Sequence, residues 1–179
     1  MKSLLISFMI VLSFTSFAQS SGDIQLPEAR KTGGKPLLDA LNDRRTIREF
    51  SEKEFSLQEI SDLLWAAYGV NRPDEKRRTA PSARNVQEFD IYVLLKNAAY
   101  RYDAFANKLI FITDENLIPI AGMQDFVAKA PLILIYVADF SKYSDKMDEQ
   151  ARNIYAGIDC GYISQNVYLY ASSEDLATV

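Results

Sequence analysis

Apolar positions recur along the chain with two different spacings, and these spacings predict helices and strands. Helical spacing marks one short segment and two longer ones, over residues 37–41, 57–68 and 148–172. The second of these begins at a capping box, Ser56-Leu57-Gln58-Glu59, in which two side chains satisfy free N–H groups at the start of a helix. Runs rich in β-branched and aromatic residues predict strands over residues 89–95, 99–102, 108–112 and 131–137.

Three segments allow more specific predictions of their structure. Residues 71–85 are rich in Pro and Arg, so we expect a loop without regular structure, and loops of this length are often functional. Residues 116–128 are expected to be helical or irregular. The run over 131–137 is apolar at nearly every position, which predicts a central strand covered on both faces.

The N-terminal residues differ in character from the rest. Lys2 precedes an almost wholly apolar stretch, and Ser16 and Ala18 are small residues of the kind a signal peptidase reads. This predicts a secretory signal peptide over residues 1–18, with an uncleaved membrane anchor as the alternative. The protein would then be exported, periplasmic or secreted, with no stable membrane anchor after cleavage. Residues 19–35 are polar and contain Pro and Gly, which predicts an extended arm that is free to lie on a partner subunit, and residues 36–179 form one domain.

Composition excludes several kinds of chemistry. The chain has 179 residues, 48% of them hydrophobic, which is enough for one core, and its net charge of −4 argues against general nucleic-acid binding. It contains one cysteine and no histidine. An internal disulfide, a histidine metal site and a Ser-His-Asp or Cys-His centre are therefore excluded, and we expect no metal site. Any reaction must use Arg, Lys, Tyr, Asp and Glu, or a bound organic cofactor.

A cluster of arginines directly follows the first predicted helix. If residues 44–48 run extended, Arg44, Thr46 and Arg48 lie on one face of the chain. Two guanidinium groups and a hydroxyl on one face are well suited to binding a phosphate. In the alternative, the segment is a solvated basic turn in which Arg45 pairs with Asp43 or Glu49. Both alternatives remain open at this point.

Two further patterns favour close approach of other groups. Pro81-Ser82-Ala83-Arg84-Asn85 combines small residues, which let a ligand approach the backbone, with side chains that donate and accept hydrogen bonds. Gly157 and Gly161 lie four residues apart in the long helix. Each costs about 1 kcal/mol relative to Ala, so tight packing against another helix is the expected compensation.

These motifs together resemble the nitroreductase family, over about residues 35–179. The resemblance rests on the sequence Arg44 to Phe50, the sequence Pro81 to Asn85, the strand ending at Val137 and the helix that contains Asp159, Gly161, Gln165 and Asn166. Within the family the chain looks closest to the branch of SagB-type dehydrogenases and exported nitroreductase-like proteins. The Arg-Arg-Thr-x-Arg motif alone is a weak signal, and its combination with Pro-Ser-Ala-x-Asn is more specific.

The resemblance implies an α+β fold, with a central mixed or antiparallel sheet flanked by helices, and a homodimer with FMN at the subunit interface. Arg44 and Thr46 would hold the FMN phosphate, and Arg48 would face the pyrimidine side of the ring. The loop over 81–85 would contact the flavin of the other subunit. The full set of cofactor-binding residues implied in this way is Arg44, Arg45, Thr46, Arg48, Pro81, Ser82, Ala83, Asn85 and Gln124.

The function implied is that of an FMN-dependent oxidoreductase. It would move electrons between NAD(P)H or another donor and a small organic acceptor, such as a nitroaromatic compound or a quinone, or oxidise a substrate in SagB-like fashion. No side chain need act as base or nucleophile, because the flavin carries the chemistry. The chain is short at its C-terminus for this family, so one alternative is a flavin-binding protein without turnover. Another is an interaction module in which the arginines only form ion pairs.

Overall fold

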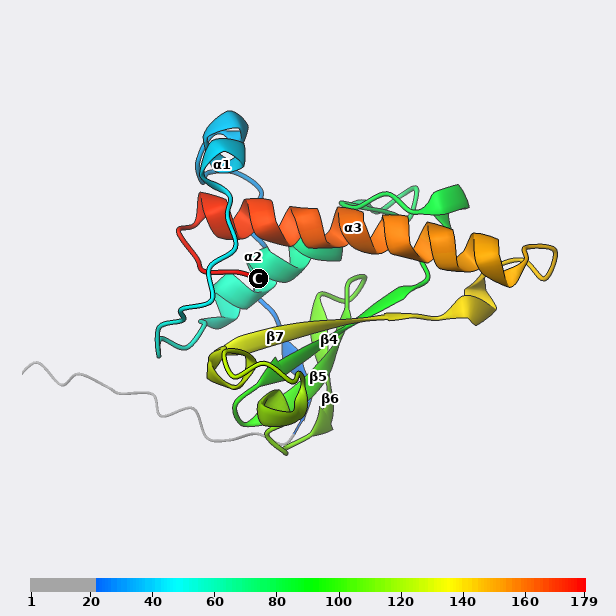
Figure 1. The fold of residues 1–179 in the computed structure, drawn as a ribbon. Coiled ribbons are helices and arrows are strands. Elements are labelled where there is room, and N and C mark those ends of the chain that lie inside the picture. Colours follow the sequence, from blue (N-terminus) through cyan, green and yellow to red (C-terminus); the bar gives the residue numbers. More distant parts are fainter. Residues whose placement is uncertain (1–21) are drawn as a thin grey trace, which may run out of the picture.

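The structure, a computed structural model, describes residues 22–179 and has an α+β architecture (Figure 1). The predicted signal peptide lies outside the described residues. One antiparallel sheet of five strands carries the helices on one face. The helices are α1 (Leu37–Asp43), α2 (Leu57–Tyr68) and α3 (Glu149–Ser173). The strands of the sheet, in spatial order, are β1 (Ile24–Gln25), β6 (Lys108–Thr113), β5 (Ala98–Asp103), β4 (Phe89–Leu95) and β7 (Leu132–Ala138). The expected fold class is confirmed.

The core lies between the sheet and the helices α2 and α3. Leu64 and Ala67 of α2 and Ile163 of α3 are completely shielded from solvent, and they pack in one cluster with Val93 of β4 and Leu109 of β6. Alternate residues of β4 enter this cluster, as the side-chain alternation of a strand requires. The bounds of β4, β5 and β6 agree with the predicted strands to within a residue or two.

The position of β7 in the sheet contradicts the expected central strand. It pairs with β4 along one side only, so within the described chain it is an edge strand. Ile135 is 37% exposed and Val137 is 44% exposed. The prediction was wrong because an apolar run reports which faces of a strand can be covered, whereas the number of paired neighbours depends on distant segments.

Helix α2 begins as its sequence predicts. Ser56 accepts a hydrogen bond from the backbone N–H of Glu59, and the Glu59 carboxylate accepts one from the Ser56 N–H at 2.8 Å. Lys53 donates a further hydrogen bond to Glu59 at 2.7 Å. Hydrogen bonds from Lys53 first, and then from Ser56, lower the pKa of Glu59 to about 2.

The Pro- and Arg-rich segment is more ordered than expected. Instead of a loop without regular structure, it forms a hairpin of β2 (Val70–Arg72) and β3 (Arg77–Arg78) followed by the 3₁₀ turn η1 (Ala83–Asn85). Arg78 supports this hairpin from inside, because its guanidinium lies 4.3 Å from the centre of the Tyr68 ring and donates to the Tyr68 carbonyl. The expectation was wrong because the hairpin is supported by this contact between two different elements, which the local sequence pattern does not record.

Residues 116–128 are largely irregular, as expected. They include the 3₁₀ turn η2 (Ile118–Ile120) and lead into a second one, η3 (Val127–Lys129). Ile118 is buried against Leu94 and Ala99, so η2 fixes this segment on the sheet.

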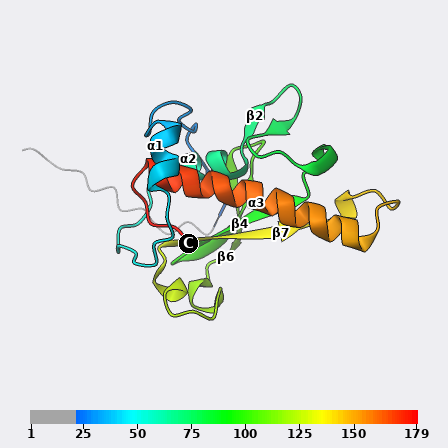
Figure 2. The same cartoon turned by 45° about the horizontal axis from the view of Figure 1, so that its top comes forward.

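Helix α3 has one face that no other part of the described chain covers. Figure 2 shows the helix crossing the front of the molecule, with α1 beside its C-terminal end. Ile154, Ile158 and Tyr162 on this face are 53%, 47% and 48% exposed. A Cβ atom placed on Gly157 or Gly161 would meet no atom within 4 Å. No helix within residues 22–179 is long and apolar enough to cross a membrane.

The described part of the N-terminal arm lies on its own chain. Ile24 and Gln25 pair with β6, and Leu26 is 3% exposed within the core. Arg30 donates to the buried Asp62 carboxylate of α2 at 2.7 Å. The described part of the arm is extended, as expected, and residues 24–30 pack against this protomer. Its contact with a partner subunit stays a prediction.

Candidate functional site

The arginine segment leaves α1 and runs extended. The Arg44 N–H donates the last hydrogen bond of the helix to Ala40, and Arg44 itself has an extended ψ of 120°. Residues 44–50 belong to no helix or strand. The N–H of Ile47 donates to the carbonyl of Thr178 at 2.9 Å, so the segment is held against the last described residues. This is the conformation that places alternate side chains on one face.

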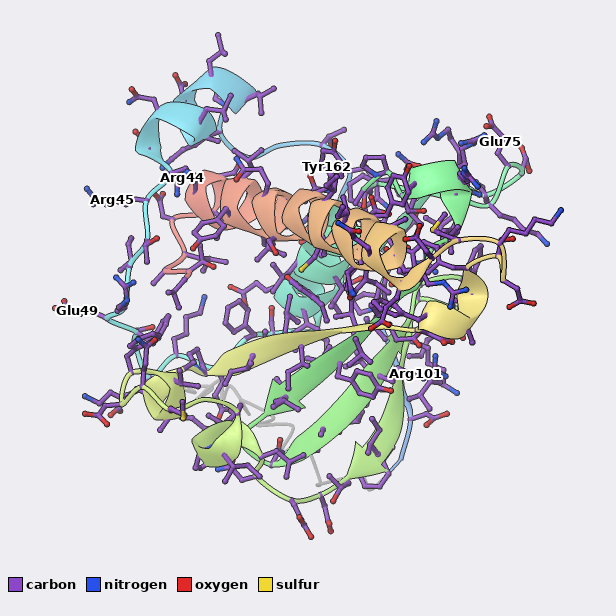
Figure 3. All side chains as sticks on the ribbon, turned by 45° about the vertical axis from the view of Figure 1, so that its right-hand side comes forward. Arg44, Arg45, Glu49, Glu75, Arg101 and Tyr162 are labelled. Atoms are coloured by element: carbon purple, nitrogen blue, oxygen red, sulfur yellow. The ribbon has the colours of Figure 1, made fainter. Side chains whose placement is uncertain are left out.

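The three residues of that face meet two aromatic side chains. The Arg44 guanidinium lies 5.4 Å from the centre of the Tyr168 ring, and the Thr46 hydroxyl lies 3.4 Å from the Tyr168 hydroxyl. The Arg48 guanidinium lies 5.5 Å from the centre of the Phe126 ring. Arg45 is exposed and points away from α3, as Figure 3 shows.

None of the ion pairs within residues 22–179 involves the arginines of this segment. Asp43 pairs with Lys35 at 3.4 Å, and neither Asp43 nor Glu49 pairs with Arg45. The basic turn closed by ion pairs, which the sequence left open, is therefore not formed. Because no carboxylate occupies their donors, the guanidinium groups of Arg44 and Arg48 are available for an anionic ligand.

A cavity of about 500 Å³ lies beside this segment. Tyr168 and Phe126, the two rings that the arginines contact, both line it. Its other walls are mostly apolar and come from β7, α3, the segment after Phe50 and the last described residues, among them Leu134, Val167 and Val179. Cationic and hydroxyl groups thus lie next to an apolar space, an arrangement typical of small-molecule sites.

The loop over residues 81–85 is held in place from both sides. The N–H of Ala83 donates to the Asp159 carboxylate of α3 at 2.8 Å, and the N–H of Gln87 donates to the Ser82 hydroxyl at 2.9 Å. Arg84 and Asn85 adopt positive φ angles of 56° and 57°. These contacts give the loop a defined shape, with Pro81 and Asn85 exposed.

The two motifs lie at different places along α3. Asp159, which holds the loop, precedes Tyr168, which meets Arg44, by nine residues, or about 14 Å along the helix axis. No hydrogen bond or ion pair in the described part of the chain joins the two motifs. The two motifs therefore have no direct contact within the described protomer, and the expectation that each comes from a different subunit stays a prediction.

Gln124 lies near the arginine motif. It is exposed in the turn before η3, where its carbonyl accepts from the N–H of Val127 at 2.9 Å. Phe126, two residues further on, lies beneath Arg48. Gln124 itself does not line the cavity.

The sequence interpretation missed the aromatic residues of the site. The sequence analysis assigns no role to Phe126 or to Tyr168. No local pattern predicts their place in the site, because each ring joins the site through its contact with an arginine that is distant in the sequence.

The antiparallel α+β fold, with guanidinium groups that form no ion pair within residues 22–179 beside a mostly apolar cavity, fits the class of proteins that bind an anionic organic molecule. Comparison with known proteins agrees. The model of the nitroreductase family matches residues 41–179. A Methanocaldococcus jannaschii protein assigned as a nitroreductase is 33% identical over 168 residues, which cover 88% of this chain and 82% of that relative.

Solved structures agree as well. A Ralstonia eutropha protein assigned as a nitroreductase is 35% identical, with a TM-score of 0.80 over 97% of this chain and 79% of the other. A Desulfovibrio desulfuricans protein of the same assignment, in complex with FMN, shares the fold at 19% identity, with a TM-score of 0.55 over 81% and 67% of the two chains. The chain belongs to the nitroreductase family, and this identifies it as an FMN-dependent oxidoreductase.

Proposed function

We propose that two copies of the chain bind FMN between them and pass electrons from a donor, NAD(P)H or another reductant, to a small organic acceptor such as a nitroaromatic compound or a quinone. The observation that carries this proposal is that the guanidinium groups of Arg44 and Arg48 form no ion pair among the described residues and lie beside an apolar cavity with aromatic walls. The same site would also serve the oxidation of a substrate in SagB-like fashion.

The residues present fit an FMN group. Arg44 and the Thr46 hydroxyl converge on Tyr168, so together they would donate charge-assisted hydrogen bonds to a phosphate. Arg48 lies further along the same face and would provide positive charge on the pyrimidine side of the ring. FMN would supply the acceptance and donation of hydride. The apolar walls of the cavity would keep water away and strengthen these polar contacts.

The second half of the site would come from a partner subunit. The loop over 81–85 contacts α3 at Asp159, nine residues before Tyr168, which Arg44 contacts, and its Ser82 and Asn85 would contact the flavin of the partner. The open face of α3 would form the dimer contact, since Ile154, Ile158 and Tyr162 are exposed there and the two glycines permit close approach.

The test is spectroscopic. Purified protein reconstituted with FMN and freed of excess cofactor should show the absorption of bound flavin, which should bleach anaerobically with a reductant and return on adding a quinone or a nitroaromatic compound. Protein that remains colourless would refute the proposal. Bound flavin that dithionite reduces, but that passes electrons to no acceptor, would favour the alternative of a flavin-binding protein without turnover.

We also propose that the protein acts outside the cytoplasm, since residues 1–18 have the composition of a secretory signal. Nicotinamide cofactors are scarce there, so the physiological electron donor would be a different reductant. Expression of the full chain with a C-terminal tag, followed by fractionation and N-terminal sequencing, tests this. A tagged protein that stays in the cytoplasm and keeps Met1 would contradict it.

A further inference from the structure

Gln87 follows the loop over 81–85 and is hydrogen-bonded to both side chains of the loop that are proposed to contact the flavin. Its backbone N–H donates to the Ser82 hydroxyl at 2.9 Å. Its side-chain nitrogen donates to the side-chain oxygen of Asn85 at 3.0 Å. These contacts decide which groups of Ser82 and Asn85 are left for a ligand.

Two neighbouring groups fix the orientation of the Gln87 carboxamide. The Nε of Arg78 donates to its oxygen at 2.8 Å, and a guanidinium group can only donate. The carbonyl of Lys76 accepts from its nitrogen at 2.6 Å, and a backbone carbonyl can only accept. The reverse orientation would lose both hydrogen bonds and place like groups together. The side-chain nitrogen of Gln87 is therefore the atom that faces Asn85.

The orientation of the Asn85 carboxamide follows from that of Gln87. Because Asn85 meets a nitrogen that donates, its oxygen faces Gln87 and its NH₂ group faces away, with no acceptor among residues 22–179. Asn85 is exposed. The Ser82 oxygen likewise accepts from Gln87, and its hydroxyl proton is donated to no group in the described part of the chain. The loop thus presents two donors, an amide and a hydroxyl, to an approaching molecule.

The backbone of the loop also depends on these contacts. Arg84 and Gln87 have positive φ angles of 56° and 55°, which side chains other than Asn, Asp and His rarely adopt. Such angles persist only where surrounding contacts determine them. Here the N–H of Ala83 donates to Asp159 before the first of them, and the N–H of Gln87 donates to Ser82 at the second.

We propose that Gln87 is a positioning residue that fixes the hydrogen-bonding direction of the loop, so that Asn85 and Ser82 donate to acceptor atoms of the ligand. A flavin carries such acceptors on its ring and on its ribityl chain, and these are the atoms that the loop would contact. This consequence for FMN rests on the proposed function, whereas the orientation of Asn85 does not.

The first test uses the full chain without FMN and measures how fast side-chain NH₂ protons exchange with water in a ¹⁵N-labelled sample. The Gln87 protons should exchange slowly, because both are donated. Those of Asn85 should exchange as fast as those of Asn97, which is exposed in the turn between β4 and β5. Gln87→Glu places a carboxylate there that can only accept, so Asn85 should reverse and its exchange should slow about 2- to 12-fold, the range for a net hydrogen bond.

Two results of this first test would overturn the proposal. One is a wild-type Gln87 that exchanges as fast as Asn97. The other is an exchange rate of Asn85 that Gln87→Glu leaves unchanged or makes faster. The second result is the one expected if Gln87 only supports the fold, because a loosened loop slows the exchange of no NH₂ group.

The second test measures the Kd of FMN by fluorescence quenching in about 1 M salt, where added charges act over only about 3 Å. Asn85→Asp keeps the acceptor for Gln87 and tolerates a positive φ, but it has no donor for the flavin, so the Kd should rise about 2- to 12-fold. Asn97→Asp adds the same charge outside the loop and should leave the Kd unchanged.

An unchanged Kd for Asn85→Asp, or an equal rise for Asn97→Asp, would refute the contact with the cofactor. If the wild type binds no FMN, the proposed function fails, while the exchange rates still decide the orientation of Asn85.

Discussion

Arg44 and Arg45 carry the same charge at adjacent positions, yet their surroundings are opposite. Arg44 lies over the ring of Tyr168 beside the cavity, and Arg45 extends into solvent (Figure 3). The difference follows from the extended backbone, which turns alternate side chains to opposite faces. The surroundings of these two arginines are therefore set by their positions in the extended segment and not by their residue type.

Loss of the Arg44 side chain should weaken FMN binding by about 1.5–3 kcal/mol, the usual worth of a hydrogen bond to a charged group. Arg44→Ala is compared with wild type by titrating FMN and following its fluorescence. Arg101→Ala removes the same charge from strand β5 and serves as the control for net charge. An equal effect of the two substitutions, or none for Arg44→Ala, would remove Arg44 from the phosphate site.

Helix α2 shows how much a local motif determines at the scale of an element. Ser56 and Glu59 satisfy each other's backbone groups, and the helix begins where the sequence predicts. Strand β7 shows the opposite. Its apolar run predicts the strand correctly but not its place at the edge of the sheet, because that place depends on pairing with β4 and on no second neighbour.

Substitution of Glu59 should make the stability of the protein less dependent on acid pH. Glu59→Gln is expected to cost about 1 kcal/mol near pH 7, the size of a helix-capping effect. The folded-state pKa of Glu59 is lowered to about 2, so its contribution is present above about pH 4.5 and is lost as the pH falls toward 2.

Urea denaturation of wild type and Glu59→Gln at several pH values measures this difference. Glu52→Gln is the matched control, since Glu52 is exposed and forms no ion pair within residues 22–179. A difference between wild type and Glu59→Gln that stays constant between pH 7 and pH 3 would show that the lowered pKa of Glu59 does not contribute to stability.

At the scale of the whole molecule, the two parts of the proposed site meet the same helix at different places. The arginine segment meets α3 at Tyr168 and the loop over 81–85 meets it at Asp159, two points about 14 Å apart along the helix axis. The uncovered face, with Ile154, Ile158 and Tyr162, lies on the same helix. A pair of protomers packed through this face would bring each loop toward the arginines of the other chain. Dimer formation and cofactor binding should therefore be lost together.

Substitution of Gly161 should weaken the proposed dimer contact without disturbing the fold of the protomer. A Cβ at this position meets nothing within the protomer, so Gly161→Leu should leave the fold intact and even favour the helix. In a dimer with closely packed helices the added side chain should cost about 1–3 kcal/mol, raising the dissociation constant about 5- to 150-fold.

Light scattering after size-exclusion chromatography, over a range of concentrations, gives the dissociation constant, and far-ultraviolet circular dichroism checks the helix. Gly161→Ala is the graded comparison, with the same gain in helix propensity but a smaller side chain. A dimer that tolerates Gly161→Leu without loss would place the interface elsewhere.

The sequence by itself determined the features that a few neighbouring residues decide. The capping box at Ser56, the alternation of Arg44, Thr46 and Arg48, and the strand over 89–95 each depend on residues within one or two turns or one strand, so local patterns predict them. The motif at residues 81–85 could be recognised in the same way, although the shape of its backbone could not.

Only the tertiary structure decided which distant residues meet. The contact of Ala83 with Asp159, the rings of Tyr168 and Phe126 beneath the arginines, and the edge position of β7 each join segments that lie far apart in the sequence. Such contacts are selected by burial and packing over the whole core, which no local pattern records. The two motifs could therefore be recognised in the sequence, while the cavity required the fold.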